Sequence, residues 1–322
     1  MGIGQAGTMA SGRFAPSPTG DLHLGNLRTA LLAWLFARST GSPFVVRMED
    51  LDRVQASEAH ERSQLHDLEA LGLDWDGEVV RQSERFDRYE AAIEQLTAAG
   101  LAYSCSCTRR EIREAASAPH GEALPDGAYP GTCRDLTDAE RRAQAASGRP
   151  LALRLRGPGT SVTVVDDLLG DVTALLDDVV LRRNDGVPAY NLAVVVDDAA
   201  QGIEQVVRAD DLASSAPRQR YLAELLGLPR VAYAHVPLVL GPTGDRLAKR
   251  DGAVTLSDQL ALGRTVDEVV GLLAWSAGLV DEPEACRPVD LVAGFDPARI
   301  RRSAWRLTER DLAADAPGTV SP

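Results

Sequence analysis

A histidine that immediately precedes an apolar periodic segment is the first feature that could do chemistry. The stretch from Arg13 to Asn26 reads RFAPSPTGDLHLGN, and Leu27 and Leu31 continue it at helical spacing. A helix is therefore expected to begin close to His23, after a turn rich in proline and glycine. The free N–H groups of a helix start favour an anion, Gly25 lets a ligand approach the backbone, and His23 can donate to a phosphate. The stretch predicts an ATP site, and it leaves open that His23 only caps the helix.

A glycine-rich loop carries a second candidate group. Residues 241–252 follow an expected strand over 235–240 and contain Lys249, the only lysine of the chain. A loop with one such cation could close over a polyphosphate and stabilise the charge that develops during transfer. The alternative is an exposed basic hairpin tip.

Charged residues also follow two expected strands. Glu49 comes directly after the apolar run 44–48, and Arg208 ends the run 203–208. Ligands of open parallel sheets bind at the carboxyl ends of the strands. Glu49 is therefore a candidate partner for an ammonium or ribose group, whereas Asp50 and Asp52 are expected to be surface or turn-capping acids. Arg208 has the position of a ligand residue, although a surface arginine remains open.

Three cysteines lie close together in the sequence. Cys105, Cys107 and Cys133 fall within one proline- and glycine-containing segment, and soft thiolates can converge on a tetrahedral Zn²⁺. The fourth ligand could be His120, Tyr129 or water, and the chemistry alone favours His120. The alternative is three free or buried thiols.

The composition indicates what class of protein carries these groups. The 322 residues are 44% hydrophobic and 25% charged, as in a globular protein with an ample core. The net charge of −13 argues against a nucleic-acid partner when taken alone, but it does not exclude a local basic face. No stretch resembles a signal peptide or a membrane span, and cysteine usage favours a reducing cytoplasm.

Strands that alternate with helices over 55–71 and 85–99 predict an α/β fold with a Rossmann-type, doubly wound parallel sheet. The expected strands over 151–156, 162–165 and 178–183 form an inserted, partly antiparallel layer, and the end is expected to be helical over 266–277 and 296–312. The expected parts are a disordered start (1–11), the first half of the catalytic domain (12–100), a zinc-binding insertion (101–187), the second half (188–260) and a short helical end (261–322).

The order of these parts resembles the catalytic domain of class I glutamyl-tRNA synthetases. RFAPSPTG and AYNLAVVVDD carry the resemblance, which runs from about Arg13 to Leu260. His23 to Asn26 stands where that family has its HIGH box, and Arg246 to Arg250 stands where it has KMSKS. The second histidine is Asn26 here, and Ala248 replaces a serine, which is the change expected to affect the rate.

The end of the chain and the cysteine spacing resemble the glutamyl-Q tRNA(Asp) synthetases within this group. About 70 residues after the KMSKS-like loop cannot build a long anticodon-binding region. The resemblance implies that glutamate is activated with ATP without tRNA and is then transferred to the queuosine base in the anticodon of tRNA(Asp). It places one structural zinc on Cys105, Cys107, Tyr129 and Cys133, in place of the choice of His120, and a monomer is expected.

The resemblance also implies a glutamate pocket. Arg13 and Arg208 would pair with the carboxylates of glutamate, because a planar guanidinium is their natural partner. Ser17, Glu49 and Tyr190 would complete the pocket, with Glu49 facing the ammonium group.

The ATP site would contain His23, Gly25, Asn26, Arg246 and Lys249. His23 would bind a phosphate, and Lys249 would neutralise charge while the carboxylate attacks the α-phosphorus in line. Mg²⁺ is expected to accompany ATP, without a dedicated protein site.

Two other functions remain open. The first is a compact glutamyl-tRNA synthetase that charges a tRNA 3′ end. The second is a catalytically silent, zinc-containing tRNA-binding paralogue, against which the joint presence of Arg13, His23, Arg208 and Lys249 argues.

Overall fold

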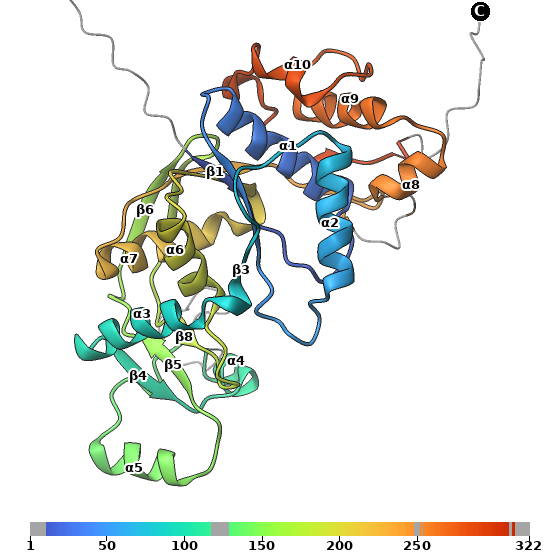
Figure 1. Ribbon diagram of the computed structural model, residues 1–322. Helices are drawn as coiled ribbons and strands as arrows, with labels where there is room; N and C mark the ends of the chain where they lie inside the picture. The colour runs from blue at the N-terminus through green and yellow to red at the C-terminus, as the bar shows by residue number, and fades with distance from the viewer. Residues whose placement is uncertain (1–10, 117–128, 248–251, 253, 309–310, 313–322) are drawn as a thin grey trace, which may run out of the picture.

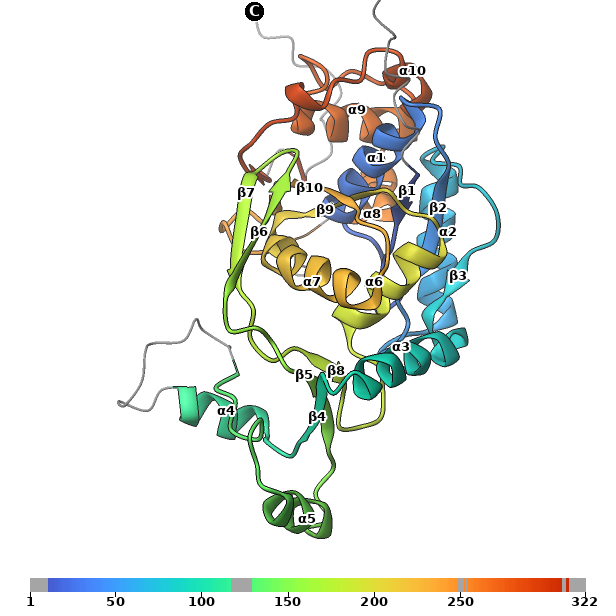
Figure 2. The ribbon, with the colours of Figure 1, turned by 90° about the vertical axis from the view of Figure 1, so that its left-hand side faces the viewer.

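A parallel sheet forms the centre of the protein. The computed structural model describes residues 11–116, 129–247, 252, 254–308 and 311–312. Its main sheet has seven strands in the order β3-β2-β1-β9-β10-β6-β7, and within it β7 alone runs antiparallel to its neighbour (Figures 1 and 2). The strands are β1 (Gly12–Phe14), β2 (Phe44–Met48), β3 (Val80–Arg81), β6 (Ser161–Asp166), β7 (Gly170–Leu175), β9 (Gln205–Ala209) and β10 (Ala232–Val236). The predicted doubly wound α/β fold is confirmed.

Helices cover both faces of this sheet. Helix α1 (Leu24–Arg38) packs on one face and is buried along most of its length, because α9 (Val266–Ala277) and α10 (Pro288–Val292) cover its other side (Figure 1). The remaining helices of the catalytic part are α2 (Glu58–Ala70), α3 (Phe86–Ala98), α6 (Tyr190–Ala200) and α7 (Ala216–Leu226), with 3-10 turns η1 (Gln82–Glu84) and η2 (Asp210–Ser215). The apolar run 192–196 thus forms part of a helix, and Asp197 and Asp198 at its end are buried.

The cysteine-containing segment belongs to a separate small sheet. Strands β4 (Ala102–Cys105), β5 (Ala152–Leu155) and β8 (Val180–Arg182) pair antiparallel below the main sheet, next to α4 (Arg109–Ala116) and α5 (Asp138–Ala146) (Figure 1). The hairpin β6–β7 lies between β5 and β8 in the sequence, but it extends the main sheet, because β6 pairs with β10 through Asp166 and Tyr233. Strand β7 was not expected from the sequence. The boundaries of the five expected parts remain a prediction.

The C-terminal part is only partly helical. The helix expected over 266–277 is confirmed as α9, preceded by α8 (Leu256–Ala261). The helix expected over 296–312 is wrong: the described residues form a 3-10 turn, η4 (Pro297–Arg299), and strand β12 (Trp305–Arg306), which pairs with β11 (Val239–Leu240). The backbone N–H of Trp305 donates to Leu238 O at 3.0 Å, so pairing with a distant strand overrides the local helical pattern.

Two further expectations concern the beginning of the chain and membranes. Of the segment 1–11 that was expected to be disordered, residue 11 alone is described, and its carbonyl accepts hydrogen bonds from Glu204 and Gln205. Within the described ranges, no helix has the length and apolar character that crossing a membrane requires.

A buried carboxyl on α2 generates a test of the fold. Burial raises the pKa of Asp67 from its ordinary 3.8 to about 6, and Asp21 acts in the same direction. The folded state binds the proton of Asp67 more tightly than the unfolded state does. Protonation of Asp67 therefore stabilises the folded state fully below about pH 4, and this stabilisation is lost as the pH rises through 6.

We therefore expect Asp67→Asn to increase the free energy of unfolding at pH 7.5 by about 1 to 3 kcal/mol, with a smaller gain at pH 4.5. Urea unfolding at both pH values measures this difference. Asp281→Asn at an exposed site is the control. An equal gain for Asp67→Asn at the two pH values would contradict the assignment.

Candidate active site

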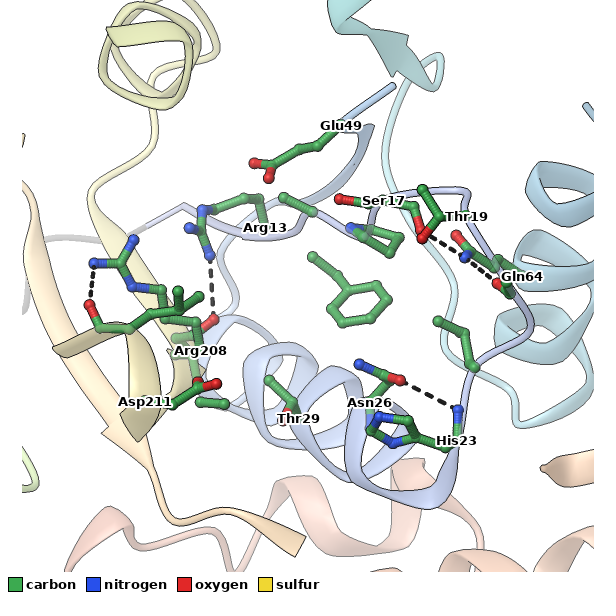
Figure 3. Close-up of a pocket in the computed structure, with 18 of the residues that line it drawn as sticks. Arg13, Ser17, Thr19, His23, Asn26, Thr29, Glu49, Gln64, Arg208 and Asp211 are labelled. Carbon is green, nitrogen blue, oxygen red and sulfur yellow. Dashed lines mark hydrogen bonds between the residues drawn. The ribbon is translucent and has the colours of Figure 1, made fainter. Parts of the chain in front are cut away.

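A cleft at the carboxyl ends of the central strands brings the predicted residues together. It has a volume of about 580 Å³ and lies over β1, β2, β9 and the start of α1 (Figure 3). The sequence-predicted residues that line it are Arg13, Ser17, His23, Asn26, Glu49, Tyr190, Arg208 and Arg246. Gly25 lines a smaller adjoining cavity of about 90 Å³ together with His23, Asn26 and Arg246. Lys249, Ala248 and Arg250 lie outside the described residues.

The proline- and glycine-rich turn is fixed by contacts from two other elements. The N–H of Glu49 donates to Pro16 O at 2.9 Å, which joins the turn to the end of β2. Gln64 on α2 donates from Nε2 to the carbonyls of Ser17 (3.0 Å) and Gly20 (2.7 Å) and lines the cleft. Figure 3 shows its side chain beside the turn. Sequence reasoning missed Gln64, since a glutamine in a helix carries no signal of a contact to a distant loop.

His23 is both a helix cap and a cleft residue. Its Nδ1 accepts from the N–H of Asn26 at 3.2 Å, and Asn26 Oδ1 accepts from the N–H of His23 at 3.2 Å. Burial lowers the pKa of His23, and the charge of Arg246 acts in the same direction. A neutral ring whose Nδ1 accepts a hydrogen bond carries its proton on Nε2. His23 therefore caps the helix, and its Nε2–H is still available as a donor to a ligand in the cleft.

Gly25 lies where the backbone and the His23 ring approach each other. A Cβ at this position would lie 3.0 Å from the ring of His23 and 3.3 Å from Val239 Cβ. A side chain would therefore disturb the cap and the wall of the smaller cavity.

A buried arginine on β2 organises the acidic side of the cleft. Arg47 has 0% exposed surface, and its Nη1 lies 2.7 Å from Asp198 Oδ1 while its Nη2 lies 3.3 Å from Glu49 Oε1. Asp198 also accepts from Arg13 Nε at 3.3 Å. Burial opposes ionisation of Asp198, but Arg47 and Arg13 outweigh it and hold its pKa below the ordinary value. Arg47 and Asp198 thereby fix Glu49 and Arg13 in place.

Only weak signals for this pair are present in the sequence. Arg47 interrupts an apolar strand, and Asp198 ends an apolar run, so each has a buried position for a charged group. Two such interruptions could have suggested a buried ion pair. They do not show that these two residues are the partners, because 151 positions separate them in the sequence.

Arg208 differs from the buried Arg13 and Arg47 in its partners, because those two form ion pairs with Asp198. It is 5% exposed, and its hydrogen bonds within the described part of the chain go to uncharged groups. They are His235 Nε2 at 3.0 Å, Tyr190 Oη at 3.3 Å, Gln219 Oε1 at 2.8 Å and Leu212 O at 3.3 Å. A buried cation without an ion pair is costly unless a ligand supplies the anion. The geometry fits a carboxylate ligand.

Buried charges of both signs surround the part of the cleft next to β1, β2 and β9. Arg13 and Arg47 pair with Asp198, and Arg47 also pairs with Glu49 and lies 4.0 Å from Asp197, which in turn pairs with Arg85. Burial raises the pKa of Glu49, although Arg47 and Arg13 lower it. An ammonium group beside Glu49 would favour its ionised form.

The three clustered cysteines converge in the small sheet. The Sγ atoms of Cys105, Cys107 and Cys133 all lie within 4.8 Å of one another, and those of Cys107 and Cys133 are 3.5 Å apart. Tyr129 Oη lies 3.3 Å from Cys105 Sγ and 3.6 Å from Cys107 Sγ. Burial raises the pKa of Cys107 to about 12, so a bound cation would have to ionise this thiol. The donors suit a tetrahedral soft metal. His120 lies outside the described residues.

A family profile and a solved structure show which class of protein has this fold and cleft. A profile of the class I tRNA synthetases (E and Q), catalytic domain, matches residues 10–280. The crystal structure of a glutamate tRNA ligase from Elizabethkingia meningosepticum in complex with its amino acid superposes with a TM-score of 0.80 at 27% identity, covering 95% of this chain and 68% of that one. The chain therefore belongs to the class I aminoacyl-tRNA synthetases, an ATP-using group of ligases.

Relatives with higher sequence identity show which family within this class the chain belongs to. A glutamyl-Q tRNA(Asp) synthetase from Nocardia farcinica is 63% identical over 302 residues, which is 94% of each chain. A glutamate–tRNA ligase from Oleidesulfovibrio alaskensis is 41% identical over 90% of this chain but over 64% of its own length. The chain belongs to the glutamyl-Q tRNA(Asp) synthetase family, and it is a ligase that activates glutamate.

The Arg47 network generates a second prediction. Replacing Arg47 with methionine leaves Asp198 and Glu49 buried without their main cation, so we expect the free energy of unfolding to fall by about 3 to 5 kcal/mol. Chemical denaturation at pH 7.5 measures the loss.

The control is Arg62→Met, which removes an arginine from a solvent-exposed pair with Glu58 and should cost less than about 1 kcal/mol. Equal losses in the two variants would show that Arg47 does not organise the buried charges.

Proposed function

We propose that the protein makes glutamyl-adenylate from L-glutamate and ATP without tRNA, and transfers the glutamyl group to the queuosine base in the anticodon of tRNA(Asp). The product would be glutamyl-queuosine in the tRNA. The observation that carries this proposal is the 63% identity to a glutamyl-Q tRNA(Asp) synthetase over 94% of both chains.

The shared length supports this acceptor over a tRNA 3′ end. The match to the glutamate–tRNA ligase covers 64% of that longer protein, whereas the match to the glutamyl-Q tRNA(Asp) synthetase covers almost the whole of it. The tRNA partner would be bound through its anticodon stem-loop, by a monomer acting in the cytoplasm.

The cleft residues next to β1, β2 and β9 bind the amino acid in this proposal. Arg208 and Arg13 bind the carboxylates, and the absence of an anionic partner for Arg208 among the described residues supports its assignment. Glu49 accepts the ammonium group, and Ser17 and Tyr190 complete the walls. Neutral donors and fixed charges that are already in place need little reorganisation when glutamate enters.

The start of α1 and the KMSKS-like loop receive ATP. His23 Nε2–H donates to a phosphate, and Gly25 and Asn26 line the nucleotide cavity with Arg246. Lys249 neutralises charge as the glutamate α-carboxylate attacks the α-phosphorus in line and pyrophosphate leaves. Mg²⁺ accompanies ATP and neutralises its phosphates.

Zinc on Cys105, Cys107, Cys133 and Tyr129 is the proposed structural metal. We expect about one zinc per purified chain, and its loss in the double variant Cys105→Ser, Cys107→Ser together with a lower melting temperature. Metal analysis and thermal unfolding measure both effects. Cys286→Ser, outside the cluster, is the control and should retain the metal. A wild-type protein that is folded and active without zinc would refute a required site.

The activity is tested in two stages. ATP–pyrophosphate exchange should depend on glutamate and proceed without tRNA. Labelled glutamate should then be found on the queuosine nucleoside after nuclease digestion of charged tRNA(Asp).

Each outcome separates the candidate functions. Label on the terminal adenosine would indicate a compact glutamyl-tRNA synthetase instead. No exchange at any glutamate concentration would indicate a silent tRNA-binding paralogue.

A further inference from the structure

A buried histidine and aspartate stand behind Arg208 without lining the cleft. His235 on β10 is the register partner of Arg208 on the neighbouring β9. Its Nε2 accepts from Arg208 Nε at 3.0 Å, and its Nδ1 lies 2.5 Å from Asp166 Oδ2 at the end of β6. Both side chains are almost fully buried. The three residues form a chain of hydrogen bonds that ends on a substrate-facing arginine.

The hydrogen bonds determine which ring nitrogen of His235 carries the proton. Asp166 Oδ1 accepts from the N–H groups of Leu168 and Leu169, both at 2.9 Å, and Oδ2 accepts from the N–H of His235 at 3.1 Å. An ionised carboxylate offers only acceptors, so Nδ1 of His235 carries the hydrogen. Burial lowers the pKa of His235, and the charge of Arg208 acts in the same direction, against the hydrogen bond to Asp166. The ring is thus a neutral Nδ1–H tautomer, and Nε2 presents a lone pair to Arg208.

A neutral acceptor has a specific advantage at this position. A carboxylate beside Arg208 would also fix the guanidinium, but it would neutralise the charge that a substrate carboxylate needs. His235 fixes the Nε side of Arg208, and Gln219 and Leu212 contact the terminal nitrogens without adding charge. The guanidinium is thus oriented without a hydrogen bond or ion pair to a carboxylate among the residues that the structure describes.

We propose that Asp166 and His235 are positioning residues for glutamate recognition. Asp166 holds His235 in the Nδ1–H tautomer, and His235 Nε2 holds the guanidinium of Arg208 in the orientation that receives a substrate carboxylate. This inference rests on the proposed role of Arg208 in binding glutamate. The structural alternative is that Asp166 only attaches the β6–β7 hairpin to β10.

Asp166→Asn tests the tautomer directly. Because Oδ1 of residue 166 accepts from the N–H groups of Leu168, Leu169 and, at 3.2 Å, His235, the amide nitrogen of asparagine would take the place of Oδ2 and donate to Nδ1 of His235. The ring would then carry its hydrogen on Nε2 and oppose the N–H of Arg208. We expect the KM for glutamate in pyrophosphate exchange to rise about 10- to 100-fold, with the KM for ATP and kcat within about threefold of wild type. Asp167→Asn is the matched control, because this neighbouring carboxylate contacts Gln205 instead.

Two substitutions of His235 separate positioning from structure. In His235→Gln the amide oxygen can occupy the place of Nε2 and accept from Arg208, whereas in His235→Asn the shorter side chain cannot reach it. Glutamine should keep the KM for glutamate within about fivefold, and asparagine should raise it as much as Asp166→Asn does. Adding Asp166→Asn to His235→Gln should have little further effect, because no tautomer remains to be changed.

Histidine NMR tests the tautomer of His235 independently of activity. With five histidines in the chain, labelled ring nitrogens can be assigned by substitution. We expect the Nδ1–H form of His235 in the wild type and the Nε2–H form in Asp166→Asn.

The outcomes distinguish this inference from the proposed function. If Arg208→Lys leaves the KM for glutamate unchanged, the assignment of Arg208 itself is wrong. If Arg208→Lys raises that KM while Asp166→Asn and His235→Asn change it no more than Asp167→Asn does, the positioning inference alone is overturned. If Asp166→Asn does not fold, equal KM values in His235→Gln and His235→Asn would likewise overturn it, and rescue by glutamine alone would support it.

Discussion

Buried guanidinium groups at the carboxyl edge of a parallel sheet impose the main constraint on this structure. Arg13, Arg47 and Arg208 come from β1, β2 and β9, which are adjacent in the main sheet. Each desolvated charge requires compensation or strong hydrogen bonds, since its burial is otherwise very costly. The protein solves this differently along the edge: Arg47 and Arg13 share Asp198, whereas Arg208 is held by neutral groups. Before any ligand enters, one end of the cleft therefore contains paired charges and the other contains an arginine with neutral partners.

The sheet also explains why elements far apart in sequence must be ordered together. Asp198 and Tyr190 belong to α6, which follows the small antiparallel sheet, yet they complete a pocket begun by β1. The hairpin β6–β7 interrupts that small sheet and attaches to β10, where Asp166 meets His235. The cysteine-containing part is therefore connected to the cleft through strand β6, and not only through its two chain connections.

The sequence predicted the architecture and most of the cleft because their signals are local. A turn before a helix and an acid after a strand can each be recognised within a few residues, and resemblance supplied Ser17 and Tyr190, whereas the predicted Lys249 lies outside the described residues. The charge network that supports them could not be predicted, because Arg47 with Asp198 and His235 with Asp166 meet only after folding. The same limit applies to the end of the chain, where pairing of Trp305 with Val239 replaced an expected helix.

Neutral support for Arg208 has a consequence for the choice between glutamate and glutamine, which have nearly the same shape. In the proposed binding mode, the side-chain or α-carboxylate of glutamate supplies Arg208 with an anionic partner. Glutamine carries one carboxylate fewer, so one of the two proposed arginine partners would face a neutral amide and remain buried without an anion. Leaving a charged group without its partner costs more than losing an ordinary contact, and sites of this kind reject the neutral analogue strongly. Had Arg208 been paired with a carboxylate of the protein, as Arg47 is with Asp198, this difference between the two amino acids would largely vanish. Under the proposed roles, discrimination depends as much on the neutral tautomer of His235 as on Arg208 itself.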